Sequence, residues 1–266
     1  MDLVDHVFAD SIQKGLPKQD ILNMMELYGL VAKFSFLSVD GKQQKYFVPA
    51  KLRSLPSGLY EVKPSNGDPC PLYLHFLDGF VPQGLFAQLL SRCIVWCSGC
   101  SPQKAPDLYQ NGARFFIGKQ TFFDLVLISK KRFIKVILRR NPQAAALSTT
   151  DSATKAREVR GFIEETLKVM SRELSWLRNL QYELCVACTH CLESPEQCSK
   201  HKSVRCADDD CLHLLPILPE EQLYCRMNFG VEPIRICGLE KWLLIDENEV
   251  KSFQTFIGMS YVIPLK

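Results

Sequence analysis

Residues 115–138 read FFIGKQTFFDLVLISKKRFIKVIL, and this stretch decides the class of fold. Three runs of aromatic and β-branched residues alternate with short polar connections, which is the pattern of neighbouring antiparallel strands. We expect these strands at residues 115–117, 122–128 and 133–138, with connections at 119–120 and 129–132. The stretch therefore predicts an antiparallel sheet.

The segments on both sides of this stretch predict helices that pack on the sheet. Downstream, apolar residues recur at helical spacing over residues 154–180, while Lys, Arg and Glu occupy the opposite side. Upstream, alternation at residues 72–76 predicts another strand, and Pro82 precedes a helical pattern at 83–93. This order of elements predicts an α+β fold, with the long amphipathic helix packed on the sheet.

The N-terminal segment predicts a helix followed by a two-stranded ribbon, as in the second half of a winged helix. An apolar stripe at residues 21–28 ends at Gly29, and the runs 31–36 and 45–48 flank Asp40-Gly41, a dipeptide suited to a tight hairpin turn. We expect three parts: a partial winged helix at 1–60, an α+β core at 61–182 and a Cys/His-rich β extension at 183–266, with short strands at 222–225, 234–237 and 242–245.

The composition is that of a folded protein without a secretory or membrane segment. Hydrophobic residues make up 47% and charged residues 23% of the chain, and the net charge is only +3. The first six residues lack the basic start and apolar region of a signal peptide. No apolar run approaches the roughly 18 residues that span a bilayer. We expect a cytoplasmic protein, in which the twelve cysteines are buried thiols or metal ligands rather than disulfides.

Eight of the twelve cysteines lie between residues 185 and 237, together with three of the histidines. Zinc binds four thiolate or imidazole groups in a tetrahedron, and a C-x2-C pair can reach one ion from a tight turn. This crowding predicts structural zinc. The candidate ligands are Cys188, Cys191, Cys198, His201, Cys206, Cys211 and His213.

The spacing leaves open which four of these residues bind and whether there are one or two ions. Cys188, Cys191, Cys198 and His201 form a C-x2-C-x6-C-x2-H series, which is enough for one closed site. The later candidates, Cys206, Cys211 and His213, could replace its second pair or belong to another site. A RING would need a closing C-x2-C pair, and only Cys225 and Cys237 follow.

Motifs of catalysis are missing, so we expect a chain that is not an enzyme. There is no G-x4-G-K-[ST] loop, no G-x-S-x-G and no H-E-x-x-H in the sequence. His75 falls on an expected strand, where a structural role is more common than that of a general base. A zinc-dependent hydrolase would need a carboxylate beside the metal, and the acidic run at 208–210 is more simply a solvated loop.

A zinc-dependent regulator that binds nucleic acid is the alternative function. It would use the winged helix and the basic residues between Lys130 and Arg140. However, Lys135 and Arg139 alternate with apolar residues, which indicates the polar side of one strand. The chain also lacks clustered aromatic residues that would stack on bases. We therefore expect no nucleic acid among the partners.

Several short segments resemble the COR domain, the scaffold that follows the GTPase domain in Roco proteins. Residues 21–30 (ILNMMELYGL) and 46–52 (YFVPAKL) resemble the end of its first half, and 72–76 (LYLHF) with 79–86 (GFVPQGLF) resemble the start of its second half. The tail is similar to that of Roco proteins of the malignant fibrous histiocytoma amplified sequence type, at VACTHC (186–191), CSKH (198–201) and DCLH (210–213).

The resemblance covers residues 15–245 and implies a scaffold rather than a nucleotide hydrolase. The sequence contains no GTPase domain, no leucine-rich repeat and only part of the first COR half. What the resemblance implies is a module that forms a homodimer and couples its dimerisation to a Roc-type GTPase domain, in cis or in trans. The chain is then a fragment or a shortened relative.

The aromatic residues of the expected strands also favour self-association. One long helix covers only one face of a sheet, so the other face must be covered by the N-terminal part or by a second chain. The alternative is that Leu85, Phe86 and Leu89 of the shorter helix already cover it. The aromatic residues concerned are Phe115, Phe116, Phe122, Phe123 and Phe133.

Overall fold

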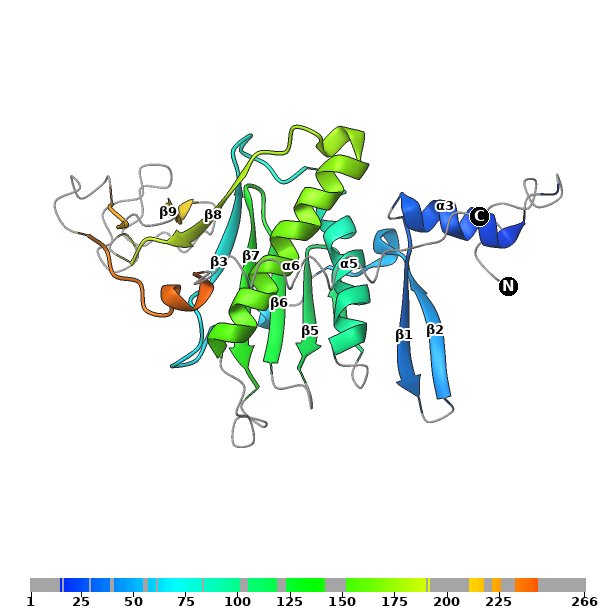
Figure 1. Ribbon diagram of the computed structural model, residues 1–266, viewed down its shortest axis with the longest axis horizontal. Coiled ribbons are helices and arrows are strands. Elements are labelled where there is room, and N and C mark those ends of the chain that lie inside the picture. The colour runs from blue at the N-terminus through cyan, green and yellow to red at the C-terminus, as the bar shows by residue number, and fades with distance from the viewer. Residues whose placement is uncertain are drawn as a thin grey trace.

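The computed structural model describes residues 15, 17–28, 30–38, 41–54, 57–60, 62–82, 84–100, 105–118, 123–141, 152–189, 191, 211–217, 222–225 and 233–243. These residues form a seven-stranded sheet with helices on one face and a separate two-stranded ribbon beside it (Figure 1). The α+β class predicted from the sequence is confirmed.

Every neighbouring pair of strands in the large sheet is antiparallel. The strands predicted at 72–76, 115–117, 122–128 and 133–138 are present in this sheet, whereas the strands at 107–109, 182–187 and 214–216 were not predicted. In place of the short strands predicted at 222–225 and 234–237, the described residues form only an isolated bridge between Tyr224 and Pro233. In spatial order the strands are β4 (Asp107–Tyr109), β5 (Gly112–Ile117), β6 (Phe123–Ser129), β7 (Phe133–Arg140), β3 (Leu72–Phe76), β8 (Tyr182–Ala187) and β9 (Leu214–Pro216).

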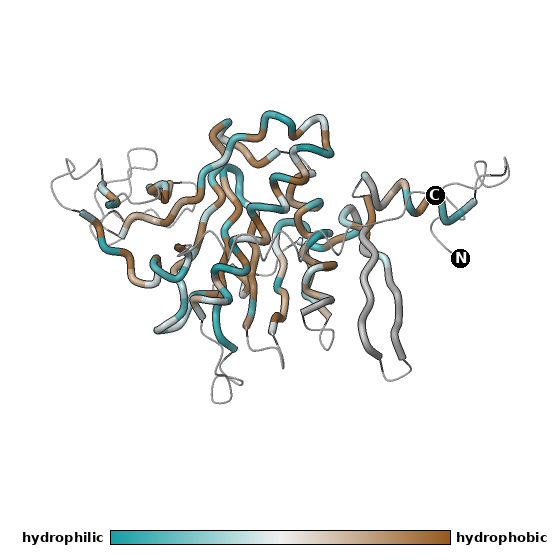
Figure 2. The backbone as a smooth tube through the Cα atoms, in the orientation of Figure 1, coloured by the Kyte–Doolittle hydropathy of each residue, from teal (hydrophilic) through white to brown (hydrophobic). Residues whose placement is uncertain are grey.

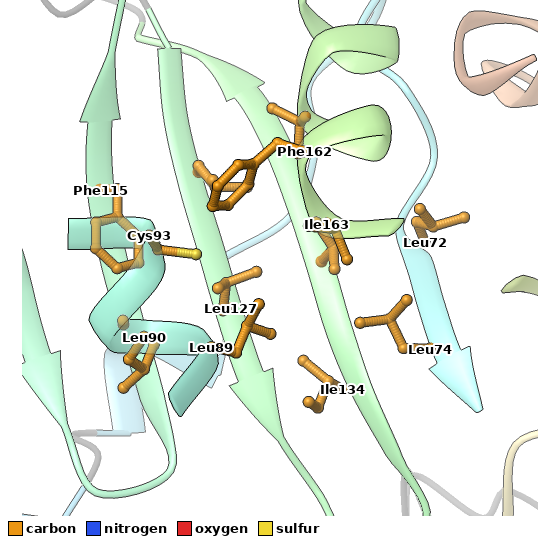
Figure 3. Packing of buried hydrophobic residues seen from close by; sticks show 14 of the residues in the cluster. Leu72, Leu74, Leu89, Leu90, Cys93, Phe115, Leu127, Ile134, Phe162 and Ile163 are labelled. Atoms are coloured by element: carbon orange, nitrogen blue, oxygen red, sulfur yellow. The ribbon is translucent and has the colours of Figure 1, made fainter. Parts of the chain in front are cut away.

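Two helices, α5 (Leu85–Cys100) and α6 (Ser152–Glu173), pack side by side on one face of this sheet. Alternate residues of each strand point toward them, so Leu127 of β6 and Ile134 of β7 meet Leu89 of α5 and Ile163 of α6 in one apolar core (Figure 3). Trp96 and Phe162 stack at 4.4 Å between ring centroids and join the two helices. Figure 2 shows the hydrophobic strands gathered behind the more polar α6.

The long helix ends earlier than its apolar pattern predicted. Helix α6 stops at Glu173, because Leu174 takes an extended conformation with φ −103° and ψ 109°. The 3-10 helix η4 (Ser175–Leu177) follows, and Leu177 remains in the core. The break reverses the chain and allows β8 to pair with β3, a long-range requirement that the helical periodicity does not reveal.

Part of the opposite face of the sheet is also buried, and α5 does not cover it. Val126, Ile128 and Ile137 pack there against Leu59 of the short helix α4 (Ser57–Tyr60). The strand aromatics that favoured self-association are buried, each at most 2% exposed: Phe115, Phe116, Phe123 and Phe133. Phe122 lies outside the described residues. Those described aromatics therefore offer no open surface to a second chain.

A buried carboxylate lies on the same face. Asp124 is fully buried, and its Oδ2 accepts hydrogen bonds from Arg114 at 2.6 Å and from Arg139 at 3.1 Å. The two guanidinium groups come from the strands on either side of β6. Charge pairing therefore replaces apolar packing at this point of the sheet.

The N-terminal helix and ribbon are present as predicted. Helix α3 (Lys18–Leu27) is followed by β1 (Ala32–Ser38) and β2 (Gly41–Phe47), which pair in register from Ala32↔Phe47 to Ser38↔Gly41. The 3-10 helix η1 (Pro49–Lys51) follows the ribbon. The side chain of Gln88 on α5 donates a hydrogen bond to the carbonyl oxygen of Tyr28, which anchors α3 to the core. Winged-helix character beyond this helix and ribbon stays a prediction.

The described residues between 188 and 243 are called here the C-terminal lobe. Strand β9 of the lobe continues the large sheet, and the boundary expected between residues 182 and 183 falls inside β8. Trp242 was expected to begin a strand, but it ends the 3-10 helix η7 (Leu239–Trp242). Its side chain is fully buried in the core, and its Nε1–H donates to the carbonyl oxygen of Cys70 at 2.7 Å.

Candidate metal centre

Four metal-binding side chains converge in the C-terminal lobe. The ligand atoms of Cys188, Cys191, His213 and Cys225 all lie within 4.8 Å of one another. His213 Nδ1 is 3.3 Å from Cys191 Sγ and 3.5 Å from Cys225 Sγ, and these two sulfur atoms are 3.6 Å apart. The nitrogen that faces the sulfur atoms is therefore Nδ1.

These distances match the edges of a zinc tetrahedron. Zn–S bonds of about 2.3 Å and Zn–N bonds of about 2.0–2.1 Å give S···S edges of about 3.8 Å and N···S edges of about 3.6 Å. The observed contacts are within a few tenths of an ångström of those edges. Four donors around one centre could hold a metal ion and would leave no position for substrate or water.

Backbone pairing brings the first three ligands together. Strands β8 and β9 pair from Cys185↔Pro216 to Ala187↔Leu214, and Cys188 N continues this ladder with a 2.9 Å hydrogen bond to His213 O. Cys188 and His213 therefore face each other at the end of two paired strands. Cys191 follows after the two-residue spacing that lets a second thiol turn back toward the first.

The fourth ligand arrives on another chain reversal. A bridge pairs Tyr224 with Pro233, and Ile234 N donates to Leu223 O at 2.7 Å. This short pairing places Cys225 against the β8–β9 end. Apolar residues pack around the four ligands and restrict the access of water. The buried apolar residues among them are Val186, Leu215 and Leu223.

Burial and mutual proximity raise the pKa of two of these cysteines, Cys188 and Cys191. Burial is the main cause that raises the pKa of Cys191 to about 12, and the neighbouring Cys225 and Cys188 raise it further. Burial likewise raises the pKa of Cys188, while the backbone N–H of Cys191 opposes that shift. A divalent cation would stabilise the thiolates that this apolar setting otherwise disfavours.

The structure places the predicted ligands in three groups. Cys188, Cys191 and His213 come together as candidate ligands of one ion. Cys211 is half-buried and lies outside that four-residue group. Cys198, His201 and Cys206 lie outside the described residues. The spacing that combined Cys188 and Cys191 with Cys198 and His201 is therefore neither confirmed nor excluded.

Cys225 was absent from the predicted ligand set. It lies twelve residues after His213 and thirty-four after Cys191, with no cysteine or histidine close to it in sequence. In the sequence, the one indication that Cys225 could be a ligand is its position within the cysteine-rich stretch between residues 185 and 237. Local spacing could not assign it, because the Tyr224–Pro233 bridge brings it to the site.

Three of the basic residues between Lys130 and Arg140 make contacts within the fold. Arg139 pairs with Asp124, Arg132 Nη2 donates to Leu212 O at 3.3 Å, and the Lys135 ammonium lies 5.8 Å from the ring centroid of Tyr73. These interactions occupy charges that the alternative function would direct to phosphates.

Within the described residues, we find no helix with the length and apolar character required to cross a membrane. The sequence matches no protein-family model. A comparison with curated protein sequences gave no significant match.

Proposed function

We propose that this chain is a non-catalytic scaffold of the Roco type whose C-terminal lobe is held by a structural Zn²⁺. The observation that carries the metal part is the convergence of Cys188, Cys191, His213 and Cys225 at tetrahedral spacing. Sites with four protein ligands are structural, because catalytic zinc keeps one position for water or substrate.

Three thiolates and one imidazole are the donor set that supports Zn²⁺ over Mg²⁺ or Ca²⁺, which prefer oxygen ligands. The ligands come from the end of β8, from the residue before β9 and from the segment after it. The ion would tie these segments together, and this part of the lobe has few buried apolar side chains of its own.

The scaffold part of the proposal rests on the COR-like segments and on the lack of catalytic motifs in the sequence. Its partners would be a second copy of the chain and a Roc-type GTPase domain, in cis or in trans, in the cytoplasm. Since the strand aromatics are buried, self-association would need another surface. The exposed apolar side chains at one end of β3 and η4 offer one: Leu77, Phe80 and Trp176.

Metal analysis of protein purified under reducing conditions tests the zinc part. We expect at least one tightly held zinc per chain, retained through dialysis. Cys225→Ser should lose this zinc, whereas Cys237→Ser, at an exposed cysteine outside the four-residue group, should keep it. A metal-free wild-type protein that is equally folded in strong chelator would contradict the proposal.

Light scattering and calorimetry test the scaffold part. A dimer at tens of micromolar that Phe80→Ser with Trp176→Ser converts to a monomer would support self-association at the exposed apolar end. A strictly monomeric wild-type protein would leave only assembly with the GTPase domain. Binding of GTP or ATP to this chain at micromolar concentration would contradict the non-catalytic assignment for nucleotides.

A further inference from the structure

A second group of metal-binding side chains lies on the face of the sheet away from α5 and α6. His75 of β3 and Glu183 and Cys185 of β8 bring an imidazole nitrogen, a carboxylate oxygen and a thiol sulfur within 4.8 Å of one another. None of these residues belongs to the four-residue group in the C-terminal lobe.

The register of the two strands explains why the three side chains meet. His75 is directly opposite Glu183, and Cys185 is two residues further along β8. Side chains two residues apart on a strand share a face, so the three form a compact triangle on that face. Strand β3 is paired on both sides, with β7 and with β8, which fixes the positions of the three Cβ atoms.

One side of this triangle is buried against the sheet, and the other side is open to solvent. Cys185 is buried in a cluster with Tyr73 and Phe133, whose rings meet edge to face at 5.2 Å. Glu183 is exposed and His75 is half-buried. A bound ion would therefore contact the apolar cluster on one side and solvent on the other.

The three side chains do not satisfy one another by hydrogen bonding. In the described part of the chain, no hydrogen bond or ion pair joins the His75 ring to the Glu183 carboxylate. Among the described residues, the Cys185 thiol makes a single long contact of 3.8 Å, to the backbone oxygen of Glu183. Three potential donors to a metal are thus close together and available.

We propose that His75, Glu183 and Cys185 form a second metal site, which takes a thiophilic divalent cation such as Zn²⁺ and completes its coordination with solvent water. Imidazole, thiolate and carboxylate together favour Zn²⁺ over the harder Mg²⁺ and Ca²⁺. Three protein ligands leave the fourth position open, unlike the closed set of the C-terminal lobe. The ion at this second site exchanges, and the open position admits an external donor.

The electrostatic setting indicates that this site is the weaker of the two. Burial, and then Arg132, lower the pKa of His75 while Glu183 opposes them, and this direction favours the neutral imidazole that binds metal ions. Burial, and then Glu183, raise the pKa of Cys185 to about 12, so the cation must displace the thiol proton. The nearby Arg132 charge also repels a cation.

The cysteine series is divided between the two sites. Cys185, Cys188 and Cys191 form a C-x2-C-x2-C run, but Cys185 packs with Tyr73 and Phe133 while Cys188 packs with Cys225. Three residues along a strand cover about 10 Å. One ion therefore does not bind all three thiols, and β8 carries a ligand set near each end.

Calorimetric titration of Zn²⁺ into the full chain, already loaded with zinc and dialysed, tests the second site. We expect one further equivalent that EDTA removes before the tightly held zinc. His75→Ala and Cys185→Ala should abolish this equivalent. Glu183→Gln should weaken it by more than about tenfold, since even outer-shell partners of a metal contribute roughly 10–100-fold.

Retention of the tightly held zinc in each variant shows that the chain is folded and separates this test from that of the closed site. Cys237→Ala, which removes an exposed thiol outside both groups, should leave the further equivalent unchanged. If Cys185→Ala does not fold, the exposed Glu183→Gln variant decides. No further equivalent in wild-type protein, or an equivalent unaffected by Glu183→Gln and His75→Ala, would overturn the proposal.

Discussion

The helix-covered core of the sheet and the C-terminal lobe are stabilised in different ways. In the core, residues from five strands and two helices bury their side chains almost completely, and Trp96 stacks on Phe162. Around the candidate metal centre, the fully buried apolar side chains are few, and two of the buried residues are the cysteines Cys188 and Cys225. The core is held mainly by apolar contact, to which Trp242 of the lobe contributes. Few buried apolar side chains surround the four ligands, so we expect the lobe to depend more strongly on a bound ion and on its anchor to the core.

The anchor between the two regions is a small set of polar contacts around Trp242. Arg160 of α6 donates from Nη1 to Trp242 O at 2.8 Å, and Lys241 Nζ donates to Ser152 Oγ at 2.9 Å. Gly238 precedes these residues at φ 84°. The core, the lobe and the anchor are therefore held by different contacts, and substitutions can change the stability of each one separately.

The largest effect should come from removing the Zn²⁺ proposed for the site formed by Cys188, Cys191, His213 and Cys225. Cys225→Ser, or strong chelation of the wild type, should expose the amides near Cys188 and His213 to hydrogen exchange, while β5–β7 keep their protection. Structural zinc supplies about 10–16 kcal/mol of apparent binding free energy in zinc-finger peptides, so the lobe should open entirely. Loss of protection in the core as well would show that the two regions do not unfold independently.

Trp242→Ala should have the next largest effect, about 3–5 kcal/mol in the free energy of unfolding. The substitution removes a fully buried ring from the core and its hydrogen bond to Cys70 O. Urea denaturation measures the loss. Tyr28→Ala is the matched control, because that ring is 61% exposed and its removal should cost less than about 1 kcal/mol. Equal effects of the two substitutions would contradict the anchor.

Gly238→Ala should destabilise the anchor by more than about 2 kcal/mol, through strain rather than lost contacts. An added Cβ at φ +84° would lie 2.8 Å from both Asp68 O and Cys70 N, which are backbone atoms with little freedom to move. Gly67→Ala is the control: its φ is +83°, but nothing lies within 4 Å of the added Cβ. Thermal unfolding should rank Gly238→Ala clearly below Gly67→Ala, which retains only the conformational cost of about 1 kcal/mol.

Asp124→Asn should have the smallest of these effects, about 1–3 kcal/mol, and it should act on the core alone. The substitution leaves Arg114 and Arg139 without the carboxylate that balances their charges, although solvent partly screens both guanidinium groups. Chemical denaturation should show this loss with the zinc content unchanged. Asp107→Asn on β4, at an exposed carboxylate, should change stability by less than about 0.5 kcal/mol.

The sequence by itself determined the class of fold and the presence of a ligand-rich segment. The apolar runs at 122–128 and 133–138 and the alternation at 72–76 are local signals, and β6, β7 and β3 lie where these patterns indicated. The C-x2-C pair of Cys188 and Cys191 was recognisable for the same reason: two ligands within one turn are constrained by nearest neighbours along the chain.

Only the tertiary structure decided which residues complete the two candidate sites. Cys225 joins the first through a distant chain reversal, and His75 joins the second through the pairing of strands more than a hundred residues apart in sequence. Tertiary packing also decides that α4 covers part of the sheet face opposite α5 and α6, and that α6 ends at Glu173. Periodicity and spacing describe what a segment can bury or bind, whereas the partners are selected by long-range packing and strand register.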